Sequence, residues 1–291
     1  MDVFSRDFEE YELRINQRAL EAFRDDLGSG DITTEALFKE DANARARIVS
    51  EEDCVLAGVL EARTILEDGR LKVSGKKDGD AVKKGDIILS IEGSLKQILA
   101  RERVSLNYIS RMSGIATLSR KLSREHGPHV LFLRKTDPGL LFSEKRAVAL
   151  GGCRPHRMNL ADGIIIKDNH LNQLAKGSDR IGAIEIALAR AAKKKARLLE
   201  VEVESAREAE VAAKAFKEFG ISGVIMLDNM RVADVKKAVK AVKSIKKLTI
   251  EASGGITEAN IAAYLRAGAD YVSTSLFLAA KPCKFKLEVT R

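Results

Sequence analysis

Basic side chains in the second half of the chain stand where short apolar runs end, or in the aperiodic segment between two such runs. The set holds four fixed cations and one histidine: Arg134, Lys135, His156, Arg157 and Lys167. Grouping like charges is unfavourable unless an anion offsets the repulsion, so we expect a ligand with several negative charges. Arginine suits planar carboxylates because its guanidinium donates two parallel hydrogen bonds. A histidine more often satisfies a hydrogen bond in a core, but His156 lies beside Arg157 in a segment without apolar periodicity.

Acidic residues supply the complementary chemistry. Glu202 lies within one apolar run, and Asp228 ends the next run. Carboxylates that face a phosphate-bearing substrate usually act through Mg²⁺, which bridges one or two carboxylates to phosphate oxygens. An alternative role is to stabilise an oxocarbenium-like cation during the reaction. The alternation of Glu200, Glu202 and Glu204 places three carboxylates on one face of a strand, where burial is unfavourable unless they have partners.

A glycine pair marks a candidate phosphate site. Ser253, Gly254 and Gly255 follow the apolar run 248–251 and precede a helical pattern at 257–267. Glycine lets the backbone approach a ligand, and free N–H groups at the start of a helix bind phosphate. By itself this tripeptide more often marks only a turn. Its place between a strand and a helix, late in the chain, favours a phosphate site.

The elements that must hold these residues alternate regularly after about residue 128. Short apolar runs lie at 130–133, 163–166, 199–203, 224–227, 248–251 and 271–273, with Ala-rich helical patterns between most of them. This alternation predicts an α/β fold with a parallel sheet. Open doubly wound sheets and barrels share the pattern. Polar residues at the carboxyl end of nearly every run favour the β/α barrel, where strand ends meet at one mouth.

The first part of the chain is mixed α and β without a regular repeat. Apolar residues at spacings of three and four predict an initial helix with one buried face: Phe4, Phe8, Tyr11, Ile15, Ala19 and Ala22. Short β patterns occupy residues 44–92. A long helical pattern follows from 94 to 125, with an expected interruption at Ser113 and Gly114.

Composition narrows the class of protein. The 291 residues carry a formal charge of +8, but aromatic residues make up only 5% and Trp is absent, which argues against a reader of single-stranded nucleic acid. Cys54, Cys153 and Cys283 are odd in number and widely spaced, as expected for unpaired thiols in a reducing compartment. We find no apolar stretch of about 18 residues and no secretory signal pattern. We therefore expect a soluble cytoplasmic protein that binds neither membranes nor nucleic acid.

Taken together, the motifs resemble those of the quinolinate phosphoribosyltransferase family. The matching segments run in the family's order from about residue 28 to 275: Gly30–Thr34, Glu102–Asn107, Arg134–Gly139, His156–Arg157, Ile166–His170, Glu200–Glu204, Met226–Asn229 and Glu251–Ile256. The resemblance implies an N-terminal α/β sandwich domain at 1–112 and an incomplete β/α barrel of the seven-stranded type at 113–275. The tail 276–291 is expected to return to the sandwich domain.

The resemblance also implies roles for individual residues. Arg134, Lys135, His156 and Arg157 would bind the two carboxylates of quinolinate, together with Arg103 from the other subunit of a homodimer that shares its active sites and can assemble further. Lys167 would lie near the reacting centre, and Glu202 and Asp228 would handle Mg²⁺ and the ribose. The 5′-phosphate would be held by a third set: Ser253, Gly254, Gly255, Ser273 and Ser275.

The implied reaction belongs to de novo NAD biosynthesis. It transfers a phosphoribosyl group from phosphoribosyl pyrophosphate to quinolinate, with loss of CO₂, and yields nicotinate mononucleotide and pyrophosphate. Two features depart from the family pattern: Ser275 stands near the place of a usual glycine, and the segment 151–155 before His156 is unusual. The alternatives are a related phosphoribosyltransferase that acts on nicotinate or another anionic base, and a basic nucleic-acid-binding protein.

Overall fold

A computed structural model describes residues 3–175, 179–243, 245 and 248–290. It divides the chain into two compact units. The sandwich unit comprises Arg6–Arg124, Thr136–Cys153 and Phe277–Arg291, and the barrel unit comprises Met1–Ser5, Glu125–Lys135 and Arg154–Leu276. The predicted boundary between residues 112 and 113 falls inside the long helix α4 (Leu95–His126). The last two residues of α4, Glu125 and His126, belong to the barrel unit, and both units combine distant segments of the sequence.

An antiparallel sheet forms the centre of the sandwich unit. Its strands follow the order β12-β1-β5-β3, with bounds Phe285–Thr290, Asn43–Ser50, Ile87–Ser94 and Lys72–Gly75. Side chains at the start of β1 alternate between exposed and buried, as expected for a sheet with one face on a core. Because β12 pairs with β1, the end of the chain belongs to this unit.

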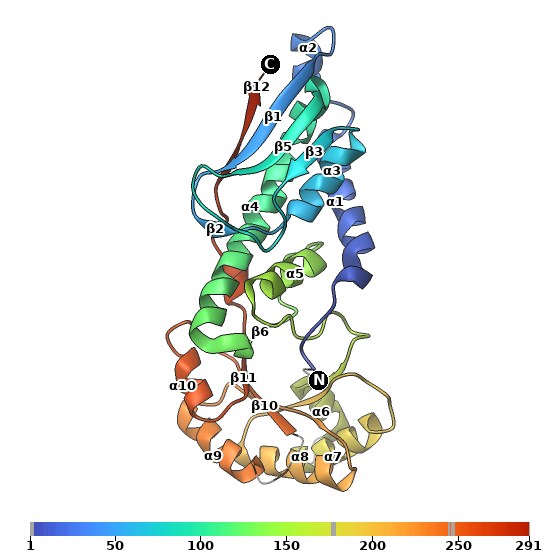
Figure 1. Cartoon of the computed structure of the whole chain (residues 1–291). Helices are drawn as coiled ribbons and strands as arrows, with labels where there is room; N and C mark the ends of the chain where they lie inside the picture. The colour runs from blue at the N-terminus through green and yellow to red at the C-terminus, as the bar shows by residue number, and fades with distance from the viewer. Residues whose placement is uncertain (1–2, 176–178, 244, 246–247, 291) are drawn as a thin grey trace. The chain divides into compact units, whose positions relative to one another are not determined.

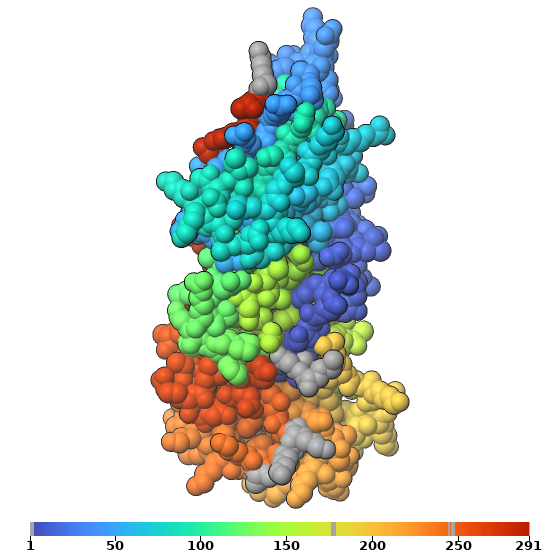
Figure 2. All heavy atoms as spheres, viewed as in Figure 1, coloured from blue at the N-terminus to red at the C-terminus, as the bar shows by residue number. Residues whose placement is uncertain are grey.

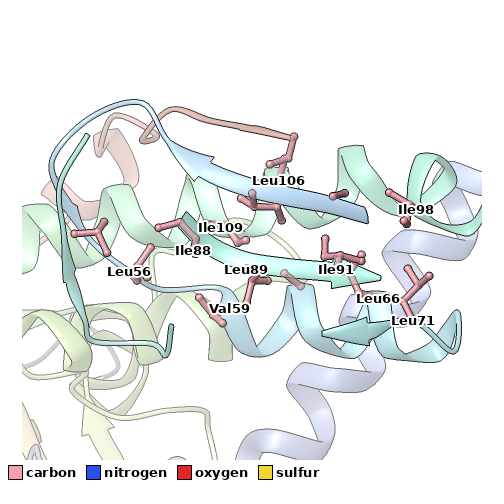
Figure 3. Close-up of a cluster of buried hydrophobic side chains, with 14 of the residues drawn as sticks. Leu56, Val59, Leu66, Leu71, Ile88, Leu89, Ile91, Ile98, Leu106 and Ile109 are labelled. Carbon is pink, nitrogen blue, oxygen red and sulfur yellow. The ribbon is translucent and has the colours of Figure 1, made fainter. Parts of the chain in front are cut away.

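Helices cover the buried face of this sheet. Ile91 of β5, Leu66 of α3 (Val59–Asp68) and Ile98 of α4 belong to one hydrophobic cluster, which Figure 3 shows in close-up. The other elements of the unit are η1 (Glu9–Tyr11), α1 (Glu12–Leu27), α2 (Ile32–Leu37), β2 (Cys54–Val55), β4 (Ala81–Val82) and α5 (Leu141–Gly151). The mixed α and β composition predicted for the first part of the chain is confirmed.

Helix α4 runs without a break (Figure 1), so the predicted interruption at Ser113 and Gly114 is wrong. Gly114 has another role. A Cβ atom at this position would lie 2.2 Å from the backbone oxygen of Lys281 and 3.0 Å from the Cα of Pro282. The glycine therefore allows the segment before β12 to pack directly on the helix backbone.

We expect Gly114→Ala to destabilise the protein by about 1–2 kcal/mol. Alanine gains about 1 kcal/mol of helix propensity, but overpacking against the backbone costs about 1–3 kcal/mol, and the short contact makes the second effect larger. Thermal unfolding measures the difference. Gly182→Ala is the matched control, because Gly182 lies in α7 (Arg180–Ala191) with nothing within 4 Å of its added Cβ. If both variants gain stability, the close approach of Lys281 to Gly114 does not require glycine, which contradicts the prediction.

A curved parallel sheet forms the barrel unit. Its strand order is β6-β11-β10-β9-β8-β7. The bounds are β6 (Val130–Phe132), β7 (Ile164–Ile166), β8 (Leu199–Val203), β9 (Gly223–Asp228), β10 (Leu248–Ser253) and β11 (Tyr271–Thr274). All six predicted strands are present. β8 is buried along almost its whole length, which is typical of a parallel sheet covered on both faces.

Helices cover the outside of this sheet. They are α6 (Asp168–Ala175), α7, α8 (Ala206–Glu218), α9 (Val232–Val242) and α10 (Ile261–Arg266), with short 3-10 turns η2 (Gly127–His129) and η3 (Leu276–Ala279) near its ends. Figure 2 shows side chains of this helical layer, coloured yellow to orange, on the outer surface. The helices connect successive strands, which confirms the predicted α/β barrel architecture.

The barrel is incomplete between β6 and β7. Within the described residues the sheet has six strands rather than the seven of the expected type. Arg154 forms a single parallel bridge with Leu131, and its N–H donates to the carbonyl oxygen of Val130 at 2.9 Å. The segment that leads to His156 therefore lies along the open edge of β6 and replaces part of the missing strand.

The first residues of the chain also belong to the barrel unit. Phe4 is fully buried, and α1 begins only at Glu12, so the prediction that Phe4 lies on the first helix is wrong. Phe4 instead joins a small apolar cluster inside the barrel unit with Leu131, Ile165, Leu198 and Val224. The spacing of Phe4 matched a helix, but its burial comes from the barrel.

Two further predictions concern membranes and thiols. None of the described helices combines the length and apolar composition that a membrane-spanning segment needs. Cys54, Cys153 and Cys283 form no disulfide within the described residues, as predicted, and all three are buried. Although Cys54 and Cys283 are distant in sequence, a hydrogen bond between their thiols raises the pKa of Cys54.

Candidate active site

The carboxyl ends of the barrel strands surround a cavity of about 460 Å³, a size that suits a small ligand. Most of the predicted site residues line it: Arg134, Lys135, His156, Arg157, Lys167, Glu202, Asp228, Ser253, Gly254 and Gly255. Sequence reasoning did not assign Leu133, Ile165, Met226 and Asn229, which complete the wall. All these residues belong to the barrel unit, so one unit brings the cations, carboxylates and glycines together.

Three of the four cations of the cavity come from two segments next to the barrel gap. Arg134 and Lys135 are exposed just after β6, whereas Arg157 is buried. The Nη1 of Arg157 donates to the carbonyl oxygen of Gly163 at 2.8 Å. Burial and the nearby charge of Arg134 lower the pKa of Arg157. An anionic ligand would relieve this repulsion and replace the lost hydration of the guanidinium.

Lys167 and Glu202 form an ion pair in the cavity. The Nζ of Lys167 lies 2.6 Å from Oε2 of Glu202, and their side chains are 46% and 7% exposed. Lys167 lies between β7 and α6, where its backbone N–H donates to Nδ1 of His170 at 2.9 Å. The histidine therefore fixes the turn that holds the lysine. The pair gives the cavity one half-exposed cation beside one buried carboxylate.

Asp228 and Asn229 stand at the end of β9. The Nδ2 of Asn229 donates to Oδ2 of Asp228 at 2.5 Å, and its backbone N–H donates to the carbonyl oxygen of Ser253 at 2.9 Å. Asn229 has a left-handed φ of 53°, a conformation that asparagine tolerates better than most residues. Asn229 therefore ties the acidic strand end to the glycine loop.

The glycine loop lies after β10. Gly254 and Gly255 both have positive φ, of 85° and 62°. The loop is held by Thr274, whose Oγ1 donates to the carbonyl oxygen of Ile256 at 3.1 Å. Helix α10 begins only at Ile261, so the expectation that the glycines open the next helix is wrong. Any phosphate site here is built from loop backbone and not from the first turn of a helix.

We expect Gly254→Ala to weaken phosphate binding strongly. Its φ of 85° is strained for alanine, and the added Cβ would lie 2.2 Å from Oδ1 and 2.8 Å from the backbone nitrogen of Asn229. The loop must therefore shift. We expect KM for the phosphate-bearing substrate to rise on the order of 10²-fold, since misplacement of about 1 Å has effects of that size. Steady-state kinetics measure this, and an unchanged KM contradicts it.

Three predicted residues lie elsewhere. Ser273 is buried in β11 and its Oγ lacks a hydrogen-bond partner among the described residues, while Ser275 is exposed just after that strand. Neither lines the cavity. Arg103 lies on α4 in the sandwich unit, with its side chain 66% exposed. The barrel cavity is thus assembled without these three side chains.

A buried polar group lies beneath the cations. The Nε2 of His156 is 3.2 Å from Oε2 of Glu251 and 3.4 Å from Oε2 of Glu200, and all three residues are buried. Burial and the neighbouring Glu251 carboxylate raise the pKa of Glu200 well above its usual value. Sequence reasoning did not assign Glu251 a role. A carboxylate within an apolar strand was a usable signal, because such a group needs partners.

Two family models match this chain. The family model described as quinolinate phosphoribosyl transferase, N-terminal domain, matches residues 31–113, and the corresponding C-terminal domain matches residues 115–288. These matches meet close to the boundary expected from the sequence. Together they cover most of the chain.

Relatives and solved structures agree with the family match. The probable carboxylating nicotinate-nucleotide pyrophosphorylase of Methanothermobacter thermautotrophicus is 35% identical over 279 residues, covering 92% of this chain and 96% of that protein. The corresponding Bacillus subtilis protein is 34% identical over 277 residues, covering 92% and 91%. The nicotinate-nucleotide pyrophosphorylase structure from Francisella tularensis matches 100% of this chain and 99% of its own, with 26% identity and a TM-score of 0.83. The chain belongs to the quinolinate phosphoribosyltransferase family.

Proposed function

We propose that this protein transfers the phosphoribosyl group of phosphoribosyl pyrophosphate to quinolinate and releases CO₂, which makes it a carboxylating nicotinate-nucleotide pyrophosphorylase. The observation that carries the proposal is the cavity itself. Arg134, Lys135, Arg157 and Lys167 face one space with two carboxylates and a glycine loop. A dicarboxylate and a phosphorylated sugar are the two ligands that this combination of groups favours.

The cations bind and orient the pyridine ring. Arg134, Lys135 and Arg157 hold its two carboxylates, which directs the ring nitrogen at the anomeric carbon of the ribose. The nitrogen lone pair forms the new C–N bond as the C–O bond to pyrophosphate breaks, and pyrophosphate leaves with the electron pair. The ring nitrogen, now cationic, stabilises the carbanion formed when the adjacent carboxylate departs as CO₂, and a proton takes its place. The protein contributes positioning and charge complementarity.

The carboxylates and the loop bind the sugar phosphate. Gly254 and Gly255 receive the 5′-phosphate through the loop backbone. Glu202 and Asp228 offer hard oxygen ligands at the cavity wall, a donor set that fits Mg²⁺. When bound, Mg²⁺ would neutralise pyrophosphate as it leaves. Lys167, paired with Glu202, lies where it can face the developing negative charge.

A homodimer with shared sites completes the proposal. The exposed guanidinium of Arg103 extends from the sandwich unit, away from its own buried core, and can serve the site of a partner subunit. An added arginine would strengthen selection for a dicarboxylate over a monocarboxylate. We place the enzyme in the cytoplasm, with its buried, unpaired thiols kept reduced.

A product assay tests the proposal. Purified protein is incubated with Mg²⁺, phosphoribosyl pyrophosphate and either quinolinate or nicotinate, and nicotinate mononucleotide and CO₂ are followed. Product from quinolinate alone is the expected result. Product from nicotinate alone would be consistent with the proposed phosphate site but would overturn the assignment of a dicarboxylate substrate. Turnover of neither base would overturn the proposed reaction.

A further inference from the structure

Both ring nitrogens of His156 have partners inside the barrel unit. The backbone N–H of Arg157 donates to Nδ1 at 2.7 Å, so Nδ1 carries no proton. The proton of the imidazole is therefore on Nε2, which points at Oε2 of Glu251 and Oε2 of Glu200. In this arrangement both nitrogens are engaged, and neither is left to bind a substrate carboxylate.

The position of the ring is fixed from several sides. The backbone of His156 has a left-handed φ of 56°, a conformation that few side chains adopt. Phe4 packs against the ring, with centroids 4.8 Å apart and planes inclined by 43°. Glu200 and Glu251 come from different strands, β8 and β10, and their carboxylates both contact Nε2. These contacts determine where the chain can continue after His156.

The residue that follows His156 is Arg157, the buried cation of the cavity, which binds quinolinate in the proposed function. The backbone N–H of Arg157 donates to Nδ1 of His156. The guanidinium of Arg157 donates to the carbonyl oxygen of Gly163 and lines the cavity. We infer that His156 is a positioning residue for Arg157, held by Glu200, Glu251 and Phe4, and acts on the dicarboxylate only through that arginine. The inference rests on the proposed function and revises the role that the family resemblance implies for His156.

Glu251 has a defined part in this arrangement. Its Oε2 accepts the Nε2 proton, while Oε1 has no hydrogen-bond partner among the described residues. An unsatisfied buried oxygen is unfavourable, so its retention needs a reason beyond stability. Glutamine at this position keeps an oxygen acceptor for Nε2, whereas alanine leaves the imidazole N–H buried and unpaired. The two substitutions therefore compare a side chain that keeps the acceptor for Nε2 with one that lacks it.

A double-mutant cycle on quinolinate kinetics tests the inference. We expect Arg157→Ala to raise KM for quinolinate on the order of 10²-fold. His156→Ala should raise it about 10- to 100-fold with KM for phosphoribosyl pyrophosphate little changed. The double variant should lie within about threefold of Arg157→Ala, because the histidine acts through the arginine. Effects that multiply would mean an independent contact with substrate and would overturn the inference.

Two conservative variants keep the test decisive if His156→Ala does not fold. Asparagine tolerates left-handed φ and its Oδ1 can accept from the next N–H, so His156→Asn should retain quinolinate KM within about fivefold. Glu251→Gln should likewise stay near wild type, and Glu251→Ala should behave as His156→Ala does. Loss of quinolinate affinity in both His156→Asn and Glu251→Gln would contradict the positioning role.

The tautomer gives a readout that needs no turnover. The protein has four histidines, and the His156 signals in a ¹H–¹⁵N spectrum are the ones lost in His156→Asn. We expect a proton on Nε2 and none on Nδ1, unchanged when quinolinate is added. A proton on Nδ1 would overturn the inference even in an active enzyme. Wild-type protein that does not use quinolinate, but shows the expected tautomer, would overturn the proposed function alone.

Discussion

Arg134→Ala lowers kcat/KM for quinolinate on the order of 10²- to 10³-fold and leaves the fold intact. Truncating one partner of a charge-assisted pair in a closed site commonly costs about 2–5 kcal/mol, which corresponds to this range. The fold tolerates the change because Arg134 is exposed just after β6, outside the buried cluster of the barrel unit. Steady-state kinetics and thermal unfolding together check both parts of the expectation.

The chemistry of the arginine gives this experiment its controls. Arg134→Lys keeps the charge but not the planar pair of donors, so we expect it to recover only part of the activity. Arg190→Ala removes another exposed arginine of the same unit, in the last turn of α7 and far in sequence from the cavity residues. It should leave kinetics unchanged. Unfolding of Arg134→Ala, or kinetics equal to those of Arg190→Ala, would contradict a carboxylate-binding role.

Asp228→Asn should lower kcat on the order of 10²- to 10³-fold and leave KM for quinolinate nearly unchanged. In the proposed function, the substitution removes a negative charge that would face the leaving pyrophosphate and Mg²⁺, and loss of one such preorganised group has effects of this size. The side-chain oxygen that accepts from Asn229 can remain, so the strand end keeps its geometry. Kinetics measured over a range of Mg²⁺ concentrations should show a weaker dependence on the metal.

A carboxylate outside the cavity provides the matched control. Glu210 lies on α8, half exposed, in an ion pair with Lys214. Glu210→Gln removes the same charge from the same unit and should leave kcat and the Mg²⁺ dependence as in wild type. An Asp228→Asn enzyme with normal kcat, or one whose main change is in quinolinate KM, would argue that Asp228 does not act on the sugar phosphate.

Much of the fold could be predicted because burial leaves a local pattern. Apolar runs of three to five residues, most of them separated by Ala-rich helical stretches, predicted all six strands of the parallel sheet. The same pattern predicted the cavity. Carboxyl ends of parallel strands meet at one mouth, so Lys167, Glu202 and Asp228 were expected to converge although they are distant in sequence.

Other features were misjudged because one local pattern fits two tertiary settings. Phe4 has helical spacing, yet it packs in the barrel unit. Periodicity indicates that a residue is buried, but it does not identify the residues that bury it. Gly114 predicted an interruption of the long helix, yet it allows a neighbouring backbone segment to approach an unbroken helix. Ser273 and Ser275 lie at a strand end but do not line the cavity, and their part in phosphate binding stays a prediction.

The amino-acid sequence by itself determined the parallel α/β architecture, the cationic and acidic strand ends and the glycine loop. Each of these depends on residue type and short-range spacing. Only the tertiary structure decided which partners the buried polar groups meet. Glu200 and Glu251 reach His156 from two different strands, and the hydrogen bond from Arg157 then fixes its tautomer. Such pairings depend on strand order and on the curvature of the sheet, which no local spacing encodes.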